Sequence, residues 1–301
     1  MATPRTPSTG AAVLRRRGTS GVAVDAQSRP PPPQSPVFAD TLGDRQFATT
    51  LARGLEILRC FTPQDVLLGN KELALRTGLP RPTISRFTYT LSRLGYLRAQ
   101  PQQRKYQLGS AVLSLGYPLL AAFPLRQLAR PAMNALADAI GGSVSMGIRD
   151  RLNIVYVETS RSRASAAPQY SDVGLSHPIA ATSIGRAYLA ACTARERTAL
   201  LNEIKVKTPQ DHARYRDALM HSVSDYKRLG FCTCYDYILP EIYGVGVPLR
   251  RRVDGEIVVF NCVVSSLGTR RSQMEREIGP RLVAMVQTLE SALAAAQRDA
   301  D

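Results

Sequence analysis

Residues 76–97, RTGLPRPTISRFTYTLSRLGYL, constrain the fold of this chain more than any other stretch. Ile84, Phe87, Leu91 and Leu94 recur at helical spacing and would form one apolar stripe on a helix. The opposite side carries arginine, serine, threonine and tyrosine but no carboxylate. A solvent-exposed helix face normally carries both positive and negative side chains. The segment therefore predicts an amphipathic helix whose solvent-exposed face binds an anionic partner.

A short helix and a hairpin complete this pattern. GNKELALRTG predicts a helix that starts at an Asn70 cap and ends at Gly78, a residue suited to the left-handed C-cap. Pro82 falls in the first turn of the next helix, where its missing N–H costs nothing. Two extended segments, YLRA and KYQLG, then flank the polar turn QPQQR. Residues 47–109 therefore predict a winged helix-turn-helix domain.

A further helix is predicted upstream, from the stretch LARGLEILRCF. Leu51, Leu55, Leu58 and Phe61 share one face at helical spacing. We expect this face to pack against the two helices that follow.

The net charge also favours a polyanionic partner. The chain has 301 residues, with 39 Lys+Arg against 24 Asp+Glu, a formal charge of +15 and a pI near 10.1. No acidic residue occurs between Glu72 and Asp138. Basic groups gathered on a predicted helix-turn-helix indicate contact with phosphate, so we predict binding to double-stranded DNA.

We predict that the wet face of the third helix and the tip of the wing contact DNA. An arginine side chain can donate two hydrogen bonds to guanine or to a phosphate group. Serine and threonine hydroxyls can hydrogen-bond to base edges or to the DNA backbone. The first helical turn reaches deepest into the major groove, while a wing tip can enter the minor groove. The predicted DNA-contacting residues are Arg81, Thr83, Ser85, Arg86, Tyr89, Arg93, Gln103, Arg104 and Lys105.

Composition divides the remainder of the chain. Residues 1–46 are rich in proline and small polar residues and predict a disordered tail. Residues 110–124 predict a linker helix punctuated by Pro124. In residues 125–301, helical and strand patterns intermix with hairpin-length links, which predicts an α+β domain with a mostly antiparallel sheet.

Localisation is inferred from apolar runs and cysteines. The longest apolar stretch, residues 111–125, is short for a membrane span and is broken by Pro118 and Pro124. No apolar signal-peptide core is evident, and five irregularly spaced cysteines indicate reduced thiols. We expect a cytoplasmic, nucleoid-associated protein.

The chain resembles the IclR-type family of bacterial transcription regulators. The matching stretches are LARGLEILRCF, KELALRTGLPRPTISRF, TLSRLGYL, YQLGSAVLSLGY, PIAATSIGRAYLA, RLGFCTCYD and YGVGVPL. The resemblance, which runs from about residue 47 to 295, implies a winged-helix N-domain and a GAF-like effector-binding C-domain. It further implies a homodimer or dimer of dimers on operator DNA, and a two-fold protein reads a palindrome.

Two departures from the family pattern stand out. Thr88 occupies a position that is usually apolar on the recognition helix. The acidic pair that follows the family's RGY stretch has no clear counterpart, and Glu241 is the nearest carboxylate. The stretch SLGYPLLAAFPLRQLARP resembles the branch that controls aromatic-acid catabolism.

An effector site is predicted around the strand FCTCYDY. A period of two places Cys232, Cys234 and Asp236 on one face, where a buried carboxyl needs hydrogen bonds or a small polar pocket. By resemblance, Asp236 and a residue in VVFNCVV match effector-contacting positions. The N-terminus of the helix after residue 182 could hold a carboxylate. The predicted effector-binding residues are Thr182, Ser183, Cys234, Asp236 and Asn261, and the predicted effector is a small organic acid, aromatic acids being one class.

Other interpretations remain at this point. These polar groups could simply cap helices and satisfy one another. Cys232 and Cys234 could form a redox sensor, although their spacing on one strand face is awkward for a disulfide. The protein could be an architectural DNA binder without a ligand. An enzyme is disfavoured because G-x-S-x-G, Walker and G-x-G-x-x-G motifs are missing, and the three histidines lack metal-ligand spacing, so we expect no cofactor or metal.

Overall fold

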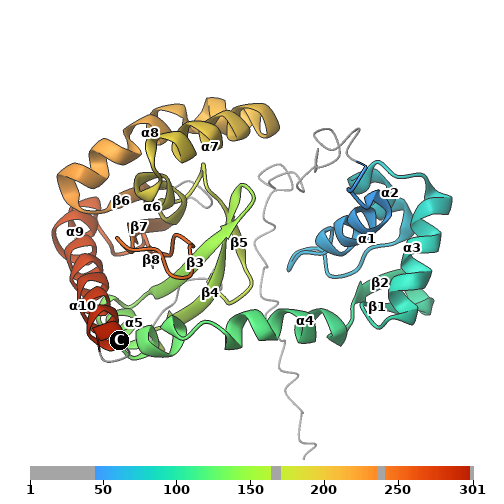
Figure 1. Cartoon of the computed structure of the whole chain (residues 1–301), viewed down its shortest axis with the longest axis horizontal. Helices are drawn as coiled ribbons and strands as arrows, with labels where there is room; N and C mark the ends of the chain where they lie inside the picture. The colour runs from blue at the N-terminus through green and yellow to red at the C-terminus, as the bar shows by residue number, and fades with distance from the viewer. Residues whose placement is uncertain (1–44, 164–170, 236–240, 299–301) are drawn as a thin grey trace, which may run out of the picture. The chain divides into compact units, whose positions relative to one another are not determined.

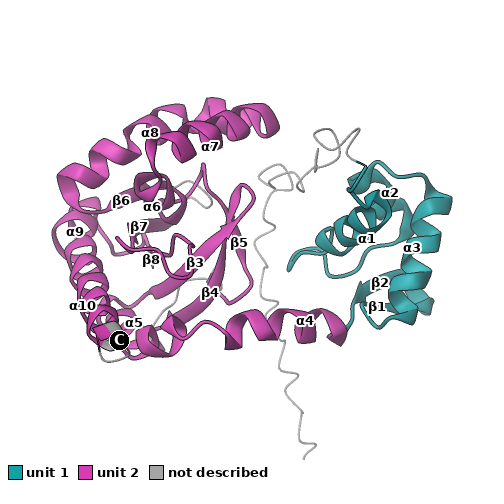
Figure 2. Cartoon of the chain, viewed as in Figure 1, with its two compact units in different colours: residues 1–109 teal, residues 110–301 magenta. Residues whose placement is uncertain are grey.

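The structure, a computed structural model, describes residues 45–163, 171–235 and 241–298. The chain divides into two compact units, residues 1–109 and 110–301 (Figure 2). Each unit has its own hydrophobic core. Residues 1–44 of the predicted tail lie outside the described residues. Within the ranges described, no helix combines the length and apolarity that a membrane span requires.

The N-terminal unit is a three-helix unit with a two-stranded wing (Figure 1). Its wing is an antiparallel hairpin closed by a 3₁₀ turn. The elements are α1 (Thr49–Arg59), α2 (Asn70–Thr77), α3 (Arg81–Arg93), β1 (Leu97–Gln100), the turn Pro101–Gln103 and β2 (Lys105–Leu108).

One apolar cluster holds this unit together. Ile57, Leu73, Ile84 and Leu97 are each at most 3 % exposed and come from α1, α2, α3 and β1. Leu68, in the α1–α2 connection, exchanges two backbone hydrogen bonds with Tyr106 of the wing. The wing is therefore part of the same folded unit as the helices.

The predicted face of α1 is confirmed for Leu58 and Phe61, which pack partly buried against the core, and is wrong for its other two leucines. Leu51 and Leu55 are 64 % and 46 % exposed, whereas Ile57 is fully buried. The apolar residues of α1 occupy two sides of the helix, and only one side can meet the small core. Gly54 lies on the buried side, where a Cβ would stand 3.8 Å from the Phe87 ring, at ordinary van der Waals contact.

The stripe of α3 also differs from the prediction at its end. Leu94 is 61 % exposed because α3 ends at Arg93 and the chain turns away. Thr88 is instead fully buried among the apolar residues. Its hydroxyl donates to the Ile84 carbonyl oxygen at 3.0 Å, so its burial leaves no unsatisfied donor.

The ends of α2 are capped by backbone and carboxylate. Gly69, rather than Asn70, is the N-cap, and its N–H donates to Glu72 Oε2 at 3.0 Å. Backbone hydrogen bonds from Glu72 and Gly69 lower the pKa of the Glu72 carboxyl. At the other end, Gly78 has φ of +69°, which confirms the predicted left-handed C-cap and sets the tight turn into α3.

The C-terminal unit is built on a six-stranded sheet in the order β5-β4-β3-β8-β7-β6. Every pairing is antiparallel, which confirms the α+β class. The strands are β3 (Ser143–Asp150), β4 (Asn153–Arg161), β5 (Ser176–Pro178), β6 (Cys232–Tyr235), β7 (Ile242–Pro248) and β8 (Val259–Ser265). The sequence did not predict β5, a three-residue edge strand held by its pairing with β4.

Helices cover both faces of this sheet (Figure 1). α5 and α10 pack against one face through a large apolar cluster, and α6, α7 and α8 pack against the other. The helices are α4 (Ser110–Ala121), α5 (Leu125–Ile140), α6 (Ser183–Ala191), α7 (Ala194–Lys207), α8 (Pro209–Leu229), α9 (Arg271–Gln273), a π turn (Met274–Ile278) and α10 (Gly279–Arg298).

Glycines let α6 lie directly on the sheet. A Cβ on Gly246 of β7 would overlap the Ser183 carbonyl oxygen, and one on Gly185 of α6 would overlap the backbone of Ile179. The first turn of α6 therefore approaches β7 at a distance that only glycine permits.

We expect Gly246→Ala to lower the free energy of unfolding of the C-terminal unit by about 1–3 kcal/mol, because the added methyl forces α6 away from β7. Chemical denaturation followed by circular dichroism measures this change. Gly116→Ala in α4 is the matched control, since a Cβ there meets no atom within 4 Å. Equal stability of Gly246→Ala and the parent protein would contradict the close approach.

Candidate nucleic-acid interface and effector site

The wet face of α3 presents most of the predicted DNA-contacting residues to solvent. Arg81, Ser85, Arg86 and Arg93 are on the solvent side of the helix, and Tyr89 is 68 % exposed. Thr83 is half-buried. α3 has no acidic residue in its first turn and ends on a basic one. The face thus presents guanidinium and hydroxyl groups that can donate hydrogen bonds, and it has no carboxylate that would repel phosphate.

The orientation of this face is set by the opposite side of α3. Ile84 and Leu91 enter the core, and Pro82 lies in the first helical turn. Gly78 provides the turn between α2 and α3. A helix fixed by its own core in this way can carry exposed side chains at defined positions, as base recognition requires.

The wing brings the remaining predicted contacts to one turn. Gln103 and Arg104 are exposed, and Arg104 adopts φ of +51° at the C-cap of the 3₁₀ turn. Lys105 is half-buried and its Nζ lies 3.7 Å from Glu72 Oε1. Lys105 is therefore tied to α2, whereas the Gln103 and Arg104 side chains extend into solvent.

Not every arginine of this unit is available to a ligand. Arg76 lies 2.9 Å from Asp65 and donates to the Cys60 carbonyl oxygen at 2.8 Å. It connects α2 to the end of α1, which is a structural role. The arginines of α3 and the wing tip are among the exposed basic residues of this unit.

A row of small and polar residues crosses the sheet of the C-terminal unit. The register aligns Thr159 of β4, Ser145 of β3, Asn261 of β8 and Gly246 of β7. Ser145 and Asn261 are 1 % and 2 % exposed. Since Gly246 lies beneath the first turn of α6, this polar row runs across the α6 face of the sheet to the N-terminus of that helix.

Hydrogen bonds join this polar row to Tyr156. The hydroxyls of Ser145 and Thr159 are 3.0 Å apart, and Asn261 Nδ2 donates to the Tyr156 hydroxyl at 2.9 Å. Burial raises the pKa of Tyr156, which keeps the phenol protonated. The Tyr156 and His177 rings lie with centroids 4.6 Å apart. Tyr156, which is bonded to the polar row, therefore has a second aromatic ring beside it, that of His177.

Asn261 Oδ1 is buried and has no hydrogen-bond partner among the residues that the structure describes. An unsatisfied buried acceptor costs about 1–3 kcal/mol. Such groups are uncommon in folded proteins and often mark a position that a ligand or water completes. The oxygen of Asn261 is thus ready to accept a hydrogen bond from a molecule bound at the polar row.

Thr182 and Ser183 lie where the polar row meets α6. The Thr182 hydroxyl accepts from the Gly185 N–H at 3.2 Å and donates to the Pro178 carbonyl oxygen at 2.8 Å, so it caps the helix. Ser183 is 3 % exposed and faces Gly244. Thr182 therefore has a capping role, and Ser183 lies between α6 and β7.

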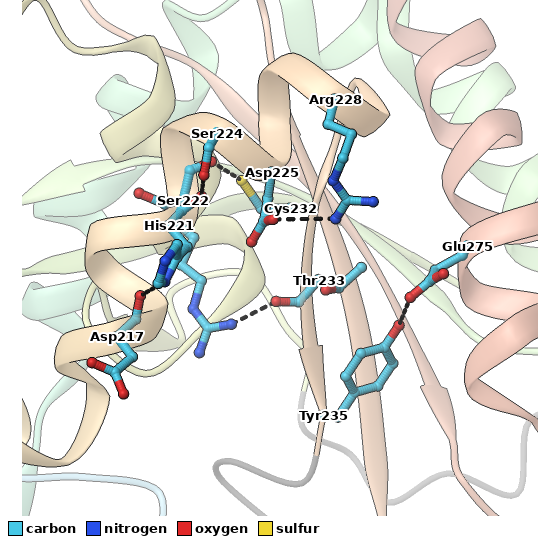
Figure 3. Close-up of polar contacts among 11 residues, drawn as sticks. Asp217, His221, Ser222, Ser224, Asp225, Arg228, Cys232, Thr233, Tyr235 and Glu275 are labelled. Carbon is cyan, nitrogen blue, oxygen red and sulfur yellow. Dashed lines mark hydrogen bonds and ion pairs between the residues drawn. The ribbon is translucent and has the colours of Figure 1, made fainter.

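The cysteines of β6 share the α6 and α8 side of the sheet. Cys234 Sγ donates to the Ala181 carbonyl oxygen and Cys232 Sγ to that of Ser222, each at 3.4 Å. Asp236, the acid predicted on the same face, lies outside the described residues. In Figure 3, Tyr235 leaves the opposite side of β6 toward Glu275, as a period of two requires.

These contacts bear on the redox alternative. All five cysteines are buried thiols. Burial raises the pKa of the Cys232 thiol to about 12, so almost no thiolate forms near neutral pH. A buried, protonated thiol is unreactive, which favours packing over redox sensing for Cys232.

The sequence interpretation missed Ser145, Tyr156 and Thr159. The available signal was the alternation at the start of β3, where Ser143 and Ser145 occupy every second position. Without the pairing of β3 with β8, nothing linked these residues to Asn261. Over the described ranges, no group of three His, Cys, Asp or Glu side chains lies close enough to hold a metal ion.

Known proteins match both units of the chain. Residues 50–101 match the IclR helix-turn-helix domain, and residues 118–294 match the C-terminal domain of the bacterial transcriptional regulator IclR. The chain is 33% identical to the HTH-type transcriptional regulator TsaQ1/TsaQ2 of Comamonas testosteroni, over 82% of this chain and 89% of that protein. It is 27% identical to the Pca regulon regulatory protein of Pseudomonas putida, over 80% and 83% of the two chains.

Solved structures agree with these matches. An IclR family transcriptional regulator from Brucella abortus superposes with a TM-score of 0.74 at 41% identity, covering 84% of this chain and 95% of that one. An IclR homolog from Microbacterium hydrocarbonoxydans, complexed with 4-hydroxybenzoate, shares the fold with a TM-score of 0.60 at 21% identity over 81% and 99% of the chains. The chain therefore belongs to the IclR family of DNA-binding transcriptional regulators, which are not enzymes.

Proposed function

We propose that this regulator recognises a palindromic operator as a homodimer or dimer of dimers and changes its operator affinity when a small organic acid binds. The α3 face and the wing would contact DNA, and the polar row would contact the acid. One observation supports each half: α3 presents arginines and hydroxyls without a carboxylate, and Asn261 Oδ1 is buried without a partner in the described part of the chain.

The DNA contacts divide into two roles. Arg81, Thr83, Ser85 and Arg86 stand in the first turns of α3, which usually approach base edges. Tyr89, Arg93 and the wing residues Gln103, Arg104 and Lys105 would bind the backbone. Base contacts carry specificity, whereas phosphate contacts add affinity that falls with salt.

The proposed effector is an organic acid with a hydrogen-bond donor. The first N–H groups of α6 point along the helix axis toward the end of the polar row and favour a carboxylate. Asn261 Oδ1 would accept from a hydroxyl of the same molecule. The contribution of Cys234 would be apolar contact through its buried sulfur, and Asp236 stays a predicted member of the site.

An aromatic acid is the favoured class. The Tyr156 and His177 rings lie next to each other beside the polar row, with centroids 4.6 Å apart. Aromatic rings stack or pack edge-to-face at centroid distances of this size, so an aromatic ligand could pack against them in the same way. The IclR homolog bound to 4-hydroxybenzoate supplies a concrete probe that has both a carboxylate and a hydroxyl. An architectural DNA binder would have no need for a buried, unpaired acceptor on its sheet.

The proposed dimer rests on α4. This helix contains no charged residue and none of its residues is buried. Leu113, Leu115, Tyr117 and Leu119 are between 57 % and 74 % exposed. An uncharged helix with this many exposed apolar side chains favours association, and two-fold pairing would set the spacing of two α3 helices on a palindrome.

Arg86→Ala should weaken binding to the specific operator by about 1–3 kcal/mol and relax its sequence preference, because a forked base contact is lost. Arg104→Ala should weaken specific and random DNA equally and flatten the salt slope by about one, because a phosphate contact is lost. Fluorescence anisotropy with both DNAs over a salt series measures these effects.

Arg195→Ala, which removes an exposed arginine from α7, serves as the control for net charge. It should leave both affinities near those of the parent. If Arg86→Ala and Arg104→Ala lose the same affinity for specific and random DNA, base reading by α3 is wrong.

A panel of small organic acids that includes 4-hydroxybenzoate should contain a stabilising ligand. A ligand at 100 times its Kd adds about 2.7 kcal/mol to the free energy of unfolding, which raises Tm by several degrees. Asn261→Ala should abolish most of this rise, while Asn202→Ala on the exposed side of α7 should retain it. If no acid in the panel shifts Tm or operator affinity, the effector proposal fails.

Replacing Leu113 and Tyr117 with glutamate should convert the protein into monomers, because four carboxylates would face one another across a two-fold apolar contact. Sedimentation equilibrium measures the mass, and operator affinity should fall at least about tenfold with loss of the second half-site. Val206→Glu, at an equally exposed position on α7, is the matched control. An unchanged mass in the double variant would exclude α4 as the dimer contact.

A further inference from the structure

The end of α4 contains a carbonyl group that the helix itself cannot satisfy. Leu120 lies in the last turn of α4, and its carbonyl oxygen would normally accept from the N–H of residue 124. Residue 124 is proline and has no N–H. The helix backbone therefore supplies no donor to this carbonyl oxygen.

Arg126 supplies a donor. Its Nη1 donates to the Leu120 carbonyl oxygen at 2.7 Å. Its other nitrogen, Nη2, lies 3.2 Å from Glu158 Oε2, and the two side chains are only 15 % and 6 % exposed. One guanidinium thus joins the C-terminal turn of α4 to strand β4, in a site largely shielded from solvent.

Glu158 is held firmly in this position. Arg130, one turn further along α5, lies 2.7 Å from the same carboxylate oxygen. The other oxygen, Oε1, accepts from the Thr159 N–H at 3.2 Å. The carboxylate is therefore bonded on both oxygens, and its position follows the backbone of β4.

The next residue of β4 belongs to the proposed effector site. Side chains alternate along a strand, so Glu158 faces α5 while Thr159 faces α6. The Thr159 hydroxyl lies 3.0 Å from that of Ser145 in the polar row. A displacement of β4 at Thr159 must move Glu158 as well, since the two share a peptide bond.

The other end of α4 leads directly to the DNA-binding unit. α4 begins at Ser110, and the preceding residue, Gly109, closes the N-terminal unit. The Gly109 N–H donates to the Tyr96 carbonyl oxygen at 2.8 Å, so the last residue before α4 is bonded to the segment that enters the wing. α4 thus follows the DNA-binding unit in the chain without an intervening loop.

We propose that Arg126, held by Glu158, is a positioning residue that transmits occupancy of the polar row to α4 and hence to operator affinity. The inference rests on the proposed effector site. Binding at Thr159 and Ser145 shifts β4, Glu158 carries Arg126 with it, and the C-terminal turn of α4 tightens or loosens. Neither Arg126 nor Glu158 needs to touch the effector or DNA.

The test uses the full-length protein and the two variants Glu158→Gln and Arg126→Lys. Glu158→Gln removes the charge that holds Arg126. Arg126→Lys keeps an ion pair with Glu158, which protects the fold, but one ammonium cannot match the two-armed contact of the guanidinium. Glu203→Gln is the control, since it breaks half-buried ion pairs with Arg149 and Lys207 elsewhere in the same unit.

Operator Kd is measured with and without 4-hydroxybenzoate, and binding of the acid is measured separately by calorimetry. In the parent and in Glu203→Gln, the acid should change operator Kd about fivefold or more. Both variants should bind the acid within about twofold of the parent yet change operator Kd less than about twofold. Full coupling in both variants overturns the proposal.

Hydrogen exchange of α4 separates this proposal from that of the effector site. Without any ligand, exchange over residues 119–123 should be faster in both variants than in the parent and in Glu203→Gln, because the Leu120 cap is lost. If hydrogen exchange over residues 119–123 is the same in both variants as in the parent, the positioning role of Arg126 is wrong. If 4-hydroxybenzoate binds no form of the protein while exchange rises as expected, the choice of effector is wrong, and the result supports only the capping of α4 by Arg126.

Discussion

The pairing of β3 with β8 at the centre of the sheet is the contact on which the C-terminal unit depends. It places Met146 opposite Phe260 on one face and Ser145 opposite Asn261 on the other. The first pair enters the larger apolar core under α5 and α10, which pins the register, because a slip by one residue would bury the polar pair there instead. The same register assembles the polar row on the α6 face. Core stability and the proposed ligand site therefore follow from one alignment.

The two units use buried polar groups in different ways. In the N-terminal unit, Thr88 is buried with its hydroxyl satisfied by its own helix, so α3 keeps a rigid base for its exposed arginines. In the C-terminal unit, Asn261 keeps one atom without a partner among the described residues, and Glu158 of β4 is paired with two arginines of α5. The first arrangement favours a fixed recognition surface. The second arrangement makes the stability of the sheet around Asn261 and Glu158 depend on a bound ligand and on the positions of α5 and α4.

Periodicity predicted most elements, because a helix or strand that buries one face repeats at its own spacing. It identified α3 with its exposed arginines and the antiparallel α+β unit. It was wrong about Leu51 and Leu55, since α1 is apolar on two sides and only packing decides which side is buried. It missed β5, whose three residues carry no pattern and are strand only through their partner β4.

The sequence by itself determined the chemistry of the exposed α3 face: an acid-free run, a left-handed glycine and a proline in the first helical turn are local properties of a few neighbouring residues. Only the tertiary structure decided which distant residues meet. Ser145, Tyr156 and Asn261 come together through strand register, and Arg126 reaches both Leu120 and Glu158 because α5 crosses β4. Such contacts depend on how separate helices and strands pack against one another. The spacing of side chains along one segment therefore cannot predict them.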